Sequence, residues 1–298
     1  MTRTLFGYAI EGDVDLTRAR PGPNGRGRLT IRRTDEELLS RTGELVSWDE
    51  TEGTQFALAT AGGDLLAWCS ITGSYLVCGP QAEIVARPSG AHEHWEHRLG
   101  STIVPLALAE RGDLALHASA LAEEGRAVLF CGPPGRGKST AAAALTLRGL
   151  ELISEDGVVI SDPGSEALAW PGQTGVRIPA GVLGALQGDG HELSSDRIKT
   201  TQLIAEAQRT DPASVGAVIL LAPVDGTRPE LQRLDPVGAL PALMPYALYG
   251  GPSRLPEALE RSAALAGRVP VFRGRLPRNL KRAGEHAHAL AELALSGR

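Results

Sequence analysis

A glycine-rich stretch in the middle of the chain limits its fold more than any other feature. Residues 132–139 read GPPGRGKS and match the pattern GxxxxGK[ST] at every fixed position. The apolar run AVLFC precedes them and the helix-forming run STAAAALTL overlaps and follows them. A strand, a glycine loop and a helix in this order form a phosphate-binding loop, whose N–H groups and helix N-terminus face an anion. We therefore predict an α/β fold built around this unit.

The residues of this loop have separate predicted roles. Lys138 would bridge the β- and γ-phosphates of a nucleotide, and the Ser139 hydroxyl would coordinate Mg²⁺. Lysine is rare in this chain, with only Lys138, Lys199 and Lys281 among 30 basic residues. We interpret the stretch as a nucleotide site rather than an incidental strand–helix turn. The other residues predicted to surround the phosphates are Gly132, Pro133, Pro134, Gly135, Arg136, Gly137 and Thr140.

The chain before the loop predicts a β-rich segment, and the chain after it alternates strands and helices. Residues 91–110 follow a helical pattern that Pro105 would kink or end. We predict a β-rich segment over residues 1–98, a candidate for substrate recognition, and a nucleotide domain with a mixed sheet and C-terminal helices over residues 99–298. The predicted strands are residues 26–34, 54–60, 64–71 and 74–79 before the loop, and 150–154, 158–161, 216–224 and 269–274 after it.

Glu155 and Asp156 directly follow the short strand that comes after the loop helix. If that strand lies next to the loop strand in a largely parallel sheet, the carboxylates come level with the phosphates. One would hold the metal and the other would accept a hydroxyl proton, although an acidic turn before glycine is an equally good local interpretation. His117 precedes the loop on a run that we expect to pair with the loop strand as a hairpin. Its imidazole is either a core side chain or a group that orients a proton.

These residues together resemble HPr kinase/phosphorylase and the looser group of related proteins. His117 lies fifteen positions before Gly132, and Glu155 and Asp156 lie seventeen and eighteen positions after Lys138, as in that family. The run RGLELISED over residues 148–156 is similar to the family's own stretch there. The resemblance covers residues 117–162, with weaker similarity over residues 171–179 and in the apolar run GAVILLAPV.

The resemblance implies a fold shared with the nucleotide domain of phosphoenolpyruvate carboxykinases and an ATP- and Mg²⁺-dependent transfer of phosphate to a hydroxyl. It assigns Asp156 to the metal with Ser139, Glu155 to the proton-accepting role and His117 to its support. Glu155 replaces the aspartate of the best-known members, so the kinase reaction is expected more than its reversal. Arg177, in TGVRIP, is a candidate phosphate contact, and Lys199 is a candidate for the same site.

The acceptor of the phosphate is not identified by the resemblance. The N-terminal segment is unlike that of full-length HPr kinases, so a hydroxyl-bearing peptide or small molecule is as plausible as a protein acceptor. A nucleotide-binding regulatory module with little transfer activity and a phosphate-loop ATPase are the alternative functions. The oligomeric state is also open, and a homo-oligomer is compatible with the sequence.

Composition argues against several other classes of function. The net charge of −5 disfavours nucleic acid and anionic membranes as partners, because both are bound by clustered positive charge. The chain lacks an apolar run long enough to span a membrane and a leader segment, so we expect a cytoplasmic protein. The histidine-rich stretch HEHWEH over residues 92–97 is interpreted as a solvated helix face rather than a metal site.

Overall fold

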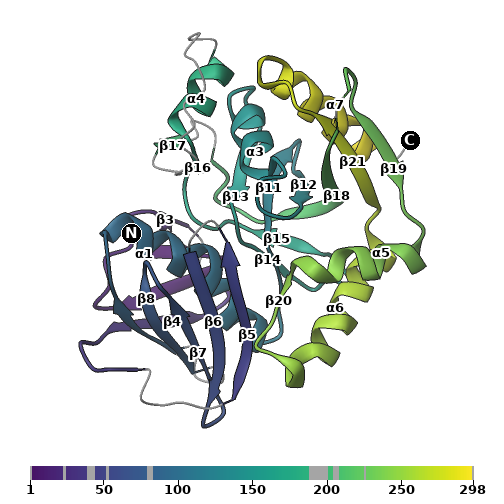
Figure 1. Cartoon of the computed structure of the whole chain (residues 1–298). Coiled ribbons are helices and arrows are strands. Elements are labelled where there is room, and N and C mark those ends of the chain that lie inside the picture. Colours follow the sequence, from purple (N-terminus) through teal and green to yellow (C-terminus); the bar gives the residue numbers. More distant parts are fainter. Residues whose placement is uncertain are drawn as a thin grey trace.

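A computed structural model describes residues 2–22, 25–38, 44–51, 54–78, 83–187, 201–203, 208–224 and 226–296. The chain forms two mixed sheets with helices, and the N-terminal sheet lies beside the sheet that carries the phosphate loop (Figure 1). The predicted α/β class with a β-rich N-terminal segment is therefore confirmed. The proposed division between residues 98 and 99 stays a prediction. Among the described helices, none is long and apolar enough to cross a membrane.

The N-terminal sheet has the strand order β3-β1-β2-β4-β9-β8-β7-β6-β5. Its pairs are antiparallel except β2 with β4 and β4 with β9, which are parallel. The four strands predicted in this half are present as β4, β6, β7 and β8, whereas the other strands of the sheet were not predicted. The strands are β1 (Arg3–Leu5), β2 (Tyr8–Gly12), β3 (Arg20–Pro21), β4 (Arg28–Arg33), β5 (Leu45–Thr51), β6 (Thr54–Ala61), β7 (Asp64–Cys69), β8 (Gly73–Cys78) and β9 (Glu83–Pro88).

The predicted helix over residues 91–110 is present, but its middle turn is not α-helical. It consists of α1 (His92–Arg98), a π-helical turn η2 (Leu99–Ile103) and α2 (Val104–Glu110). Pro105 lies in the first turn of α2, so the chain stays helical past the proline. A proline has no N–H to donate to the carbonyl four residues earlier, which here belongs to Ser101. Buried residues of this helical stretch share one apolar core with the N-terminal sheet.

The second sheet has the strand order β13-β11-β12-β18-β15-β14-β10-β20, and β21 extends it by pairing with β18 and β19. Strand β18 runs parallel to both β12 and β21, and the other pairs are antiparallel. Its strands are β10 (Leu114–Leu116), β11 (Ala118–Glu123), β12 (Arg126–Cys131), β13 (Glu151–Ser154), β14 (Val158–Ser161), β15 (Leu168–Trp170), β18 (Ala213–Val224), β19 (Glu230–Arg233), β20 (Ala247–Leu248) and β21 (Val271–Pro277).

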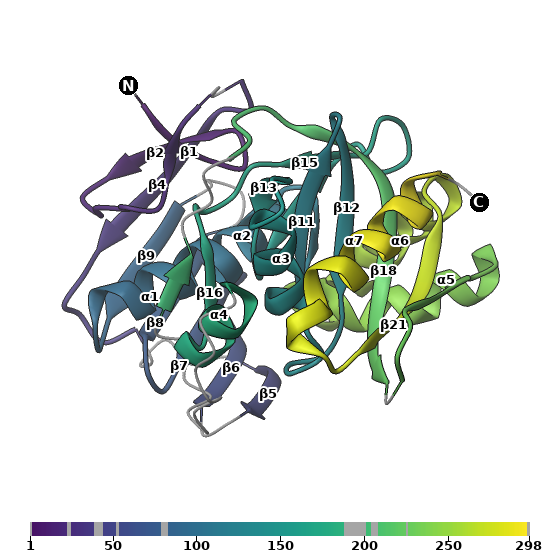
Figure 2. The ribbon, with the colours of Figure 1, turned by 90° about the horizontal axis from the view of Figure 1, so that it is seen from above.

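Helices cover both faces of this sheet because its central strands alternate apolar side chains between two cores. Val128 and Phe130 of β12 belong to the core with α3 and α7, whereas Leu129 and Cys131 belong to the core with α5 and α6. Figure 2 shows α3 and α7 side by side over the sheet. The helices are α3 (Lys138–Thr146), α4 (Ala180–Gln187), α5 (Pro236–Leu243), α6 (Leu255–Arg268) and α7 (Ala283–Ser296). A separate small sheet consists of β16 (Val176–Ile178) and β17 (Thr201–Leu203). The 3₁₀ turns are η3 (Met244–Tyr246), η4 (Pro252–Arg254) and η5 (Leu280–Arg282).

The strand that precedes the carboxylate pair, β13, does not lie directly next to the loop strand, which was the arrangement considered from the sequence. Strand β11 lies between them and is antiparallel to both β12 and β13. Two antiparallel steps make β13 parallel to β12, so the ends of both strands still reach the same edge of the sheet. The hairpin predicted between the run carrying His117 and the loop strand is present, with Ala118 opposite Cys131.

Candidate phosphate-binding site

The predicted phosphate loop connects β12 to α3 at the carboxyl end of a central strand. Gly135 and Gly137 have φ angles of +73° and +95°, which side chains other than glycine rarely adopt. A Cβ on Gly132 would lie 3.2 Å from the carbonyl oxygen of Leu221 on the neighbouring strand β18. Gly135 and Gly137 are therefore required by the local backbone, and Gly132 by its closeness to the neighbouring strand.

The exposed and buried parts of the loop are clearly divided. Pro133, Pro134, Gly135 and Arg136 form its exposed tip, and Thr140 is half-buried. Lys138 and Ser139, at the start of α3, are only 6% and 9% exposed. Lys138 Nζ donates to the carbonyl oxygens of Gly132 at 2.7 Å and Pro133 at 3.4 Å, which holds the ammonium group inside the curve of the loop.

Glu155 reaches the start of the loop helix. Ser139 Oγ donates to Glu155 Oε1 at 2.8 Å, and Glu155 is 2% exposed. Glu155 follows β13, so this contact joins residues that are sixteen positions apart. The carboxylate pair predicted from the sequence is therefore at the phosphate loop, and its first member contacts the hydroxyl that was predicted to bind metal.

Asp156 has a φ of +68°, a value that is uncommon outside glycine but that aspartate adopts more often than most residues. Its carboxylate lies near two imidazoles. His117 Nδ1 lies 2.9 Å from the main-chain oxygen of Asp156 and 3.5 Å from its Oδ1. A carbonyl oxygen can only accept, so Nδ1 of His117 carries a hydrogen. His97 Nε2 lies 3.4 Å from the other carboxylate oxygen, Oδ2. The structure thus places His117 beside Asp156, and it also places there His97, which was not predicted as a site residue.

His97 and Glu96 correct our interpretation of the stretch HEHWEH as a solvated helix face. The Glu96 and His97 side chains are 2% and 13% exposed. Burial lowers the pKa of His97 to about 4, against the opposing effect of Asp156. The reason is tertiary: residues 17 and 18, together with the loop of Asp156, cover this part of α1. Among the described residues, no group of three or more His, Cys, Asp or Glu side chains forms a metal site.

Arg18 is a second residue at the site that the sequence does not single out. Its Nη1 lies 2.8 Å from His97 Nδ1, and its Nε and Nη2 donate to the carbonyl oxygen of Thr174 at 3.1 and 2.9 Å. Burial lowers its pKa, while the charge of Glu155 raises it. The segment TRAR around it has no motif, and only the fold brings it here.

Arg177 lies on β16 and is half-buried. Burial lowers its pKa, and the negative charges of Glu93, Glu155 and Asp156 act in the opposite direction. The candidate phosphate contact is therefore electrostatically coupled to the carboxylate pair. The other candidate, Lys199, lies outside the described residues.

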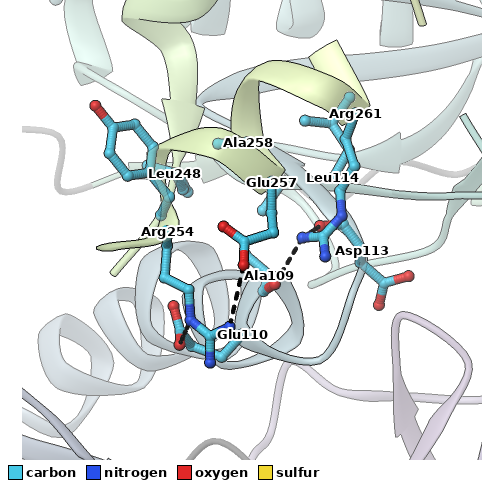
Figure 3. Close-up of a pocket in the computed structure, with 11 residues that line it drawn as sticks. Ala109, Glu110, Asp113, Leu114, Leu248, Arg254, Glu257, Ala258 and Arg261 are labelled. Carbon is cyan, nitrogen blue, oxygen red and sulfur yellow. Dashed lines mark hydrogen bonds and ion pairs between the residues drawn. The ribbon is translucent and has the colours of Figure 1, made fainter. Parts of the chain in front are cut away.

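Two cavities lie away from the loop. One, between α2 and α6, is about 10 Å³ and is closed by Arg254 Nε donating to Glu110 Oε2 at 2.8 Å and Arg261 Nη1 donating to the Ala109 oxygen at 3.0 Å (Figure 3). Such a volume holds about one water molecule at most. The other is an open groove of about 440 Å³ beside Arg126 and Ser214. It lies at the N-terminal ends of β12 and β18, whereas the phosphate loop follows the C-terminal end of β12. Neither is at the phosphate loop.

Comparisons with known proteins find a distant likeness among solved structures and none among family models or curated proteins. No protein-family model matches the sequence, and no curated protein matches it either. Among solved structures, the HPr(Ser) kinase/phosphatase from Coxiella burnetii is similar in structure, with 17% sequence identity and a TM-score of 0.32. That likeness covers 61% of this chain and 99% of the other.

Proposed function

We propose that this protein is an ATP- and Mg²⁺-dependent phosphotransferase that moves the γ-phosphate of ATP to a serine or other hydroxyl of a peptide, protein or small molecule. The proposal rests above all on the 2.8 Å contact between Ser139 Oγ and Glu155 Oε1. A phosphate loop alone indicates that a nucleotide binds. A carboxylate pair at its helix start adds the groups that phosphoryl transfer to a hydroxyl requires.

The proposed reaction has one bond made and one broken. The acceptor oxygen attacks the γ-phosphorus, and the bond from that phosphorus to its bridging oxygen breaks, so that ADP leaves with the electron pair. The hydroxyl proton passes to a carboxylate of the pair. Lys138 would offset negative charge on the phosphates from inside the loop, where it is 6% exposed.

The residues at the loop fit Mg²⁺. Ser139, Glu155 and Asp156 offer hydroxyl and carboxylate oxygens, the hard donors that this ion prefers. Magnesium is usually held by one or two carboxylates together with substrate phosphates and waters, so a complete protein cage is not required. When bound, the ion would neutralise charge on the β- and γ-phosphate oxygens.

The contacts favour a division of roles opposite to the one that the family resemblance implies. Glu155 lies beside Ser139, the hydroxyl expected at the metal, whereas Asp156 lies between two imidazoles. We therefore propose Glu155 as the carboxylate nearer the metal and Asp156 as the proton acceptor, oriented by His117. The substitutions Glu155→Gln and Asp156→Asn test these two assignments.

The test is transfer of label from γ-³²P-ATP. The protein is incubated with Mg²⁺ and a panel of serine-containing peptides and small alcohols, and acid-stable label on an acceptor is measured beside free phosphate. We expect labelled acceptor from the unchanged protein and a loss of transfer in Lys138→Ala. Lys281→Ala, an exposed lysine on η5, is the matched control and should transfer normally.

The other outcomes separate the alternative functions. Free phosphate without labelled acceptor would replace our proposal with an ATPase. ATP binding without turnover would replace it with a regulatory nucleotide module. Equal transfer by Lys138→Ala and the unchanged protein would remove the phosphate loop from the reaction altogether.

A further inference from the structure

The position of Asp156 depends on residues from the N-terminal part of the chain. Each oxygen of its carboxylate lies near a different imidazole, with His117 at 3.5 Å from Oδ1 and His97 at 3.4 Å from Oδ2. His117 belongs to the sheet of the phosphate loop. His97 belongs to α1, which packs in the core of the N-terminal sheet.

The hydrogen bond from Arg18 determines which nitrogen of His97 carries the hydrogen. Arg18 Nη1 lies 2.8 Å from His97 Nδ1. A guanidinium group has only donors, so Nδ1 must accept and the hydrogen of the neutral ring must be on Nε2. Nε2 is the nitrogen that faces Asp156. The chain of donors therefore runs in one direction, from Arg18 through His97 to the carboxylate.

Arg18 is itself held on several sides. Its Nε and Nη2 donate to the Thr174 oxygen, and its main-chain N–H donates to Glu96 Oε1 at 2.6 Å. Glu96 also accepts from Thr17 Oγ1 at 2.7 Å. With Arg18 only 6% exposed, its guanidinium has little freedom to leave His97.

We propose that Arg18 and His97 are positioning residues, which hold the Asp156 carboxylate in place through a one-directional chain of hydrogen bonds. The expected effect on transfer rests on the proposed function, but the series of hydrogen bonds from Arg18 to Asp156 does not. It gives the N-terminal segment a part in the site, because Arg18 and His97 both precede residue 99. Outer partners of this kind typically change activity by about 10- to 100-fold when removed.

Two substitutions of His97 separate positioning from packing. The amide nitrogen of His97→Gln can take the place of Nε2 and donate to Asp156, whereas the shorter amide of His97→Asn can take only the place of Nδ1 beside Arg18. We expect kcat for transfer to fall about 10- to 100-fold in His97→Asn and far less in His97→Gln. KM for ATP should stay the same in both variants, because the side chain at position 97 faces Arg18 and Asp156 rather than the phosphate loop.

The matched controls are His94→Gln and His94→Asn on the same helix, because His94 contacts Glu93 rather than the site. Both should leave kcat unchanged. Equal kcat in His97→Gln and His97→Asn would overturn the positioning role. Thermal unfolding of each variant shows whether a loss of kcat reflects a loss of folded protein.

A second measurement needs no activity. In protein labelled with ¹⁵N-histidine and free of metal, the ring nitrogens of His97 are identified by their loss in His97→Gln. We expect Nδ1 to resonate as an unprotonated nitrogen and Nε2 as a protonated one, and the opposite tautomer would overturn the chain. If the unchanged protein transfers no phosphate, the proposed function fails, and this spectrum still decides the contact of Arg18 with His97.

Discussion

At the scale of single residues, the site depends on which atom of each carboxylate meets which neighbour. Glu155 and Asp156 are adjacent in the sequence, but Glu155 contacts a hydroxyl of the loop helix and Asp156 contacts two imidazoles. The positive φ of Asp156 separates the directions of the two side chains. The two adjacent carboxylates therefore contact different groups in the structure.

Substituting each carboxylate by its amide tests this division. We expect Glu155→Gln to raise the Mg²⁺ concentration needed for half-maximal transfer by about 10- to 100-fold, as loss of a metal contact does. Asp156→Asn should lower kcat by about 10²- to 10⁴-fold at saturating metal, as loss of a general base does. The reverse pattern would support the assignment that the family resemblance implies.

Cys131 provides a test of burial next to the loop. It is fully buried, and burial raises the pKa of its thiol to about 12. Because the thiolate is the reactive form, Cys131 should resist iodoacetamide in the native protein, while the half-buried Cys78 reacts first. Peptide mass spectrometry after native and urea-unfolded labelling measures both sites. Native labelling of Cys131 at the rate of Cys78 would show that the end of β12 opens to solvent.

At the scale of elements, the π-helical turn and the Asp156 loop fit against each other. Pro105 cannot donate to the carbonyl of Ser101, and Gly157 packs so closely on that carbonyl that a Cβ would lie 2.0 Å away. Ser154 Oγ also donates to the Gly157 oxygen at 2.5 Å. The turn after β13 is therefore shaped by the helix it contacts as well as by its own sequence.

Gly157→Ala should destabilise this contact. We expect the free energy of unfolding to fall by about 1–3 kcal/mol, as for other overpacked sites, with a loss of transfer activity. Gly267→Ala is the control, because Gly267 lies on α6 with open space around it and should gain up to about 1 kcal/mol from helix propensity. Urea unfolding measures both changes. An unchanged stability in Gly157→Ala would mean that the Asp156 loop moves freely away from η2.

Sequence patterns gave a correct account of elements whose signals are local. The loop, α3 and the hairpin of β11 with β12 were all predicted, because glycine spacing and apolar runs act over a few residues. The place of β13 in the sheet could not be predicted, since pairing between strands that are distant in the chain has no local pattern. The burial of Glu96 and His97 was missed for the same reason.

At the scale of the whole molecule, arginines of the N-terminal segment bind main-chain oxygens of the second sheet region. Arg20 is 5% exposed, and its guanidinium donates to the carbonyl oxygens of Ile153 at 3.3 Å and Gln173 at 3.1 Å. Burial lowers its pKa to about 10. Arg20 ties β3 to the strand that leads into Glu155, and Arg18 ties the residues before β3 to the segment around Thr174.

The buried imidazole at this contact makes stability depend on pH. Because burial lowers the pKa of His97 to about 4 from its usual value near 6.5, the unfolded chain binds a proton between these values that the folded chain does not. The free energy of unfolding should therefore be unaffected by His97 above pH 6.5, and protonation of His97 in the unfolded chain should lower it by about 3 kcal/mol as the pH drops to 4. Arg18 and Arg177 also lower this pKa, and Asp156 raises it.

Urea unfolding in EDTA at several pH values measures this effect. The free energy of unfolding should fall more steeply between pH 6.5 and 4 in the unchanged protein than in His97→Gln, which has no titrating ring. His94→Gln should keep the steeper slope. Equal slopes in all three proteins would show that His97 is accessible to protons in the folded state.

The phosphate loop could be predicted from the local sequence, because glycine adopts the positive φ angles of +73° and +95° at Gly135 and Gly137 at little steric cost. The sequence also placed a carboxylate pair at the end of the next strand. The contacts of Ser139 with Glu155, of Arg18 with His97 and of His97 with Asp156 depend on the tertiary structure. These contacts join residues far apart in the chain, and they form because the packing of two sheets and one helix brings their ends together, which no local pattern records.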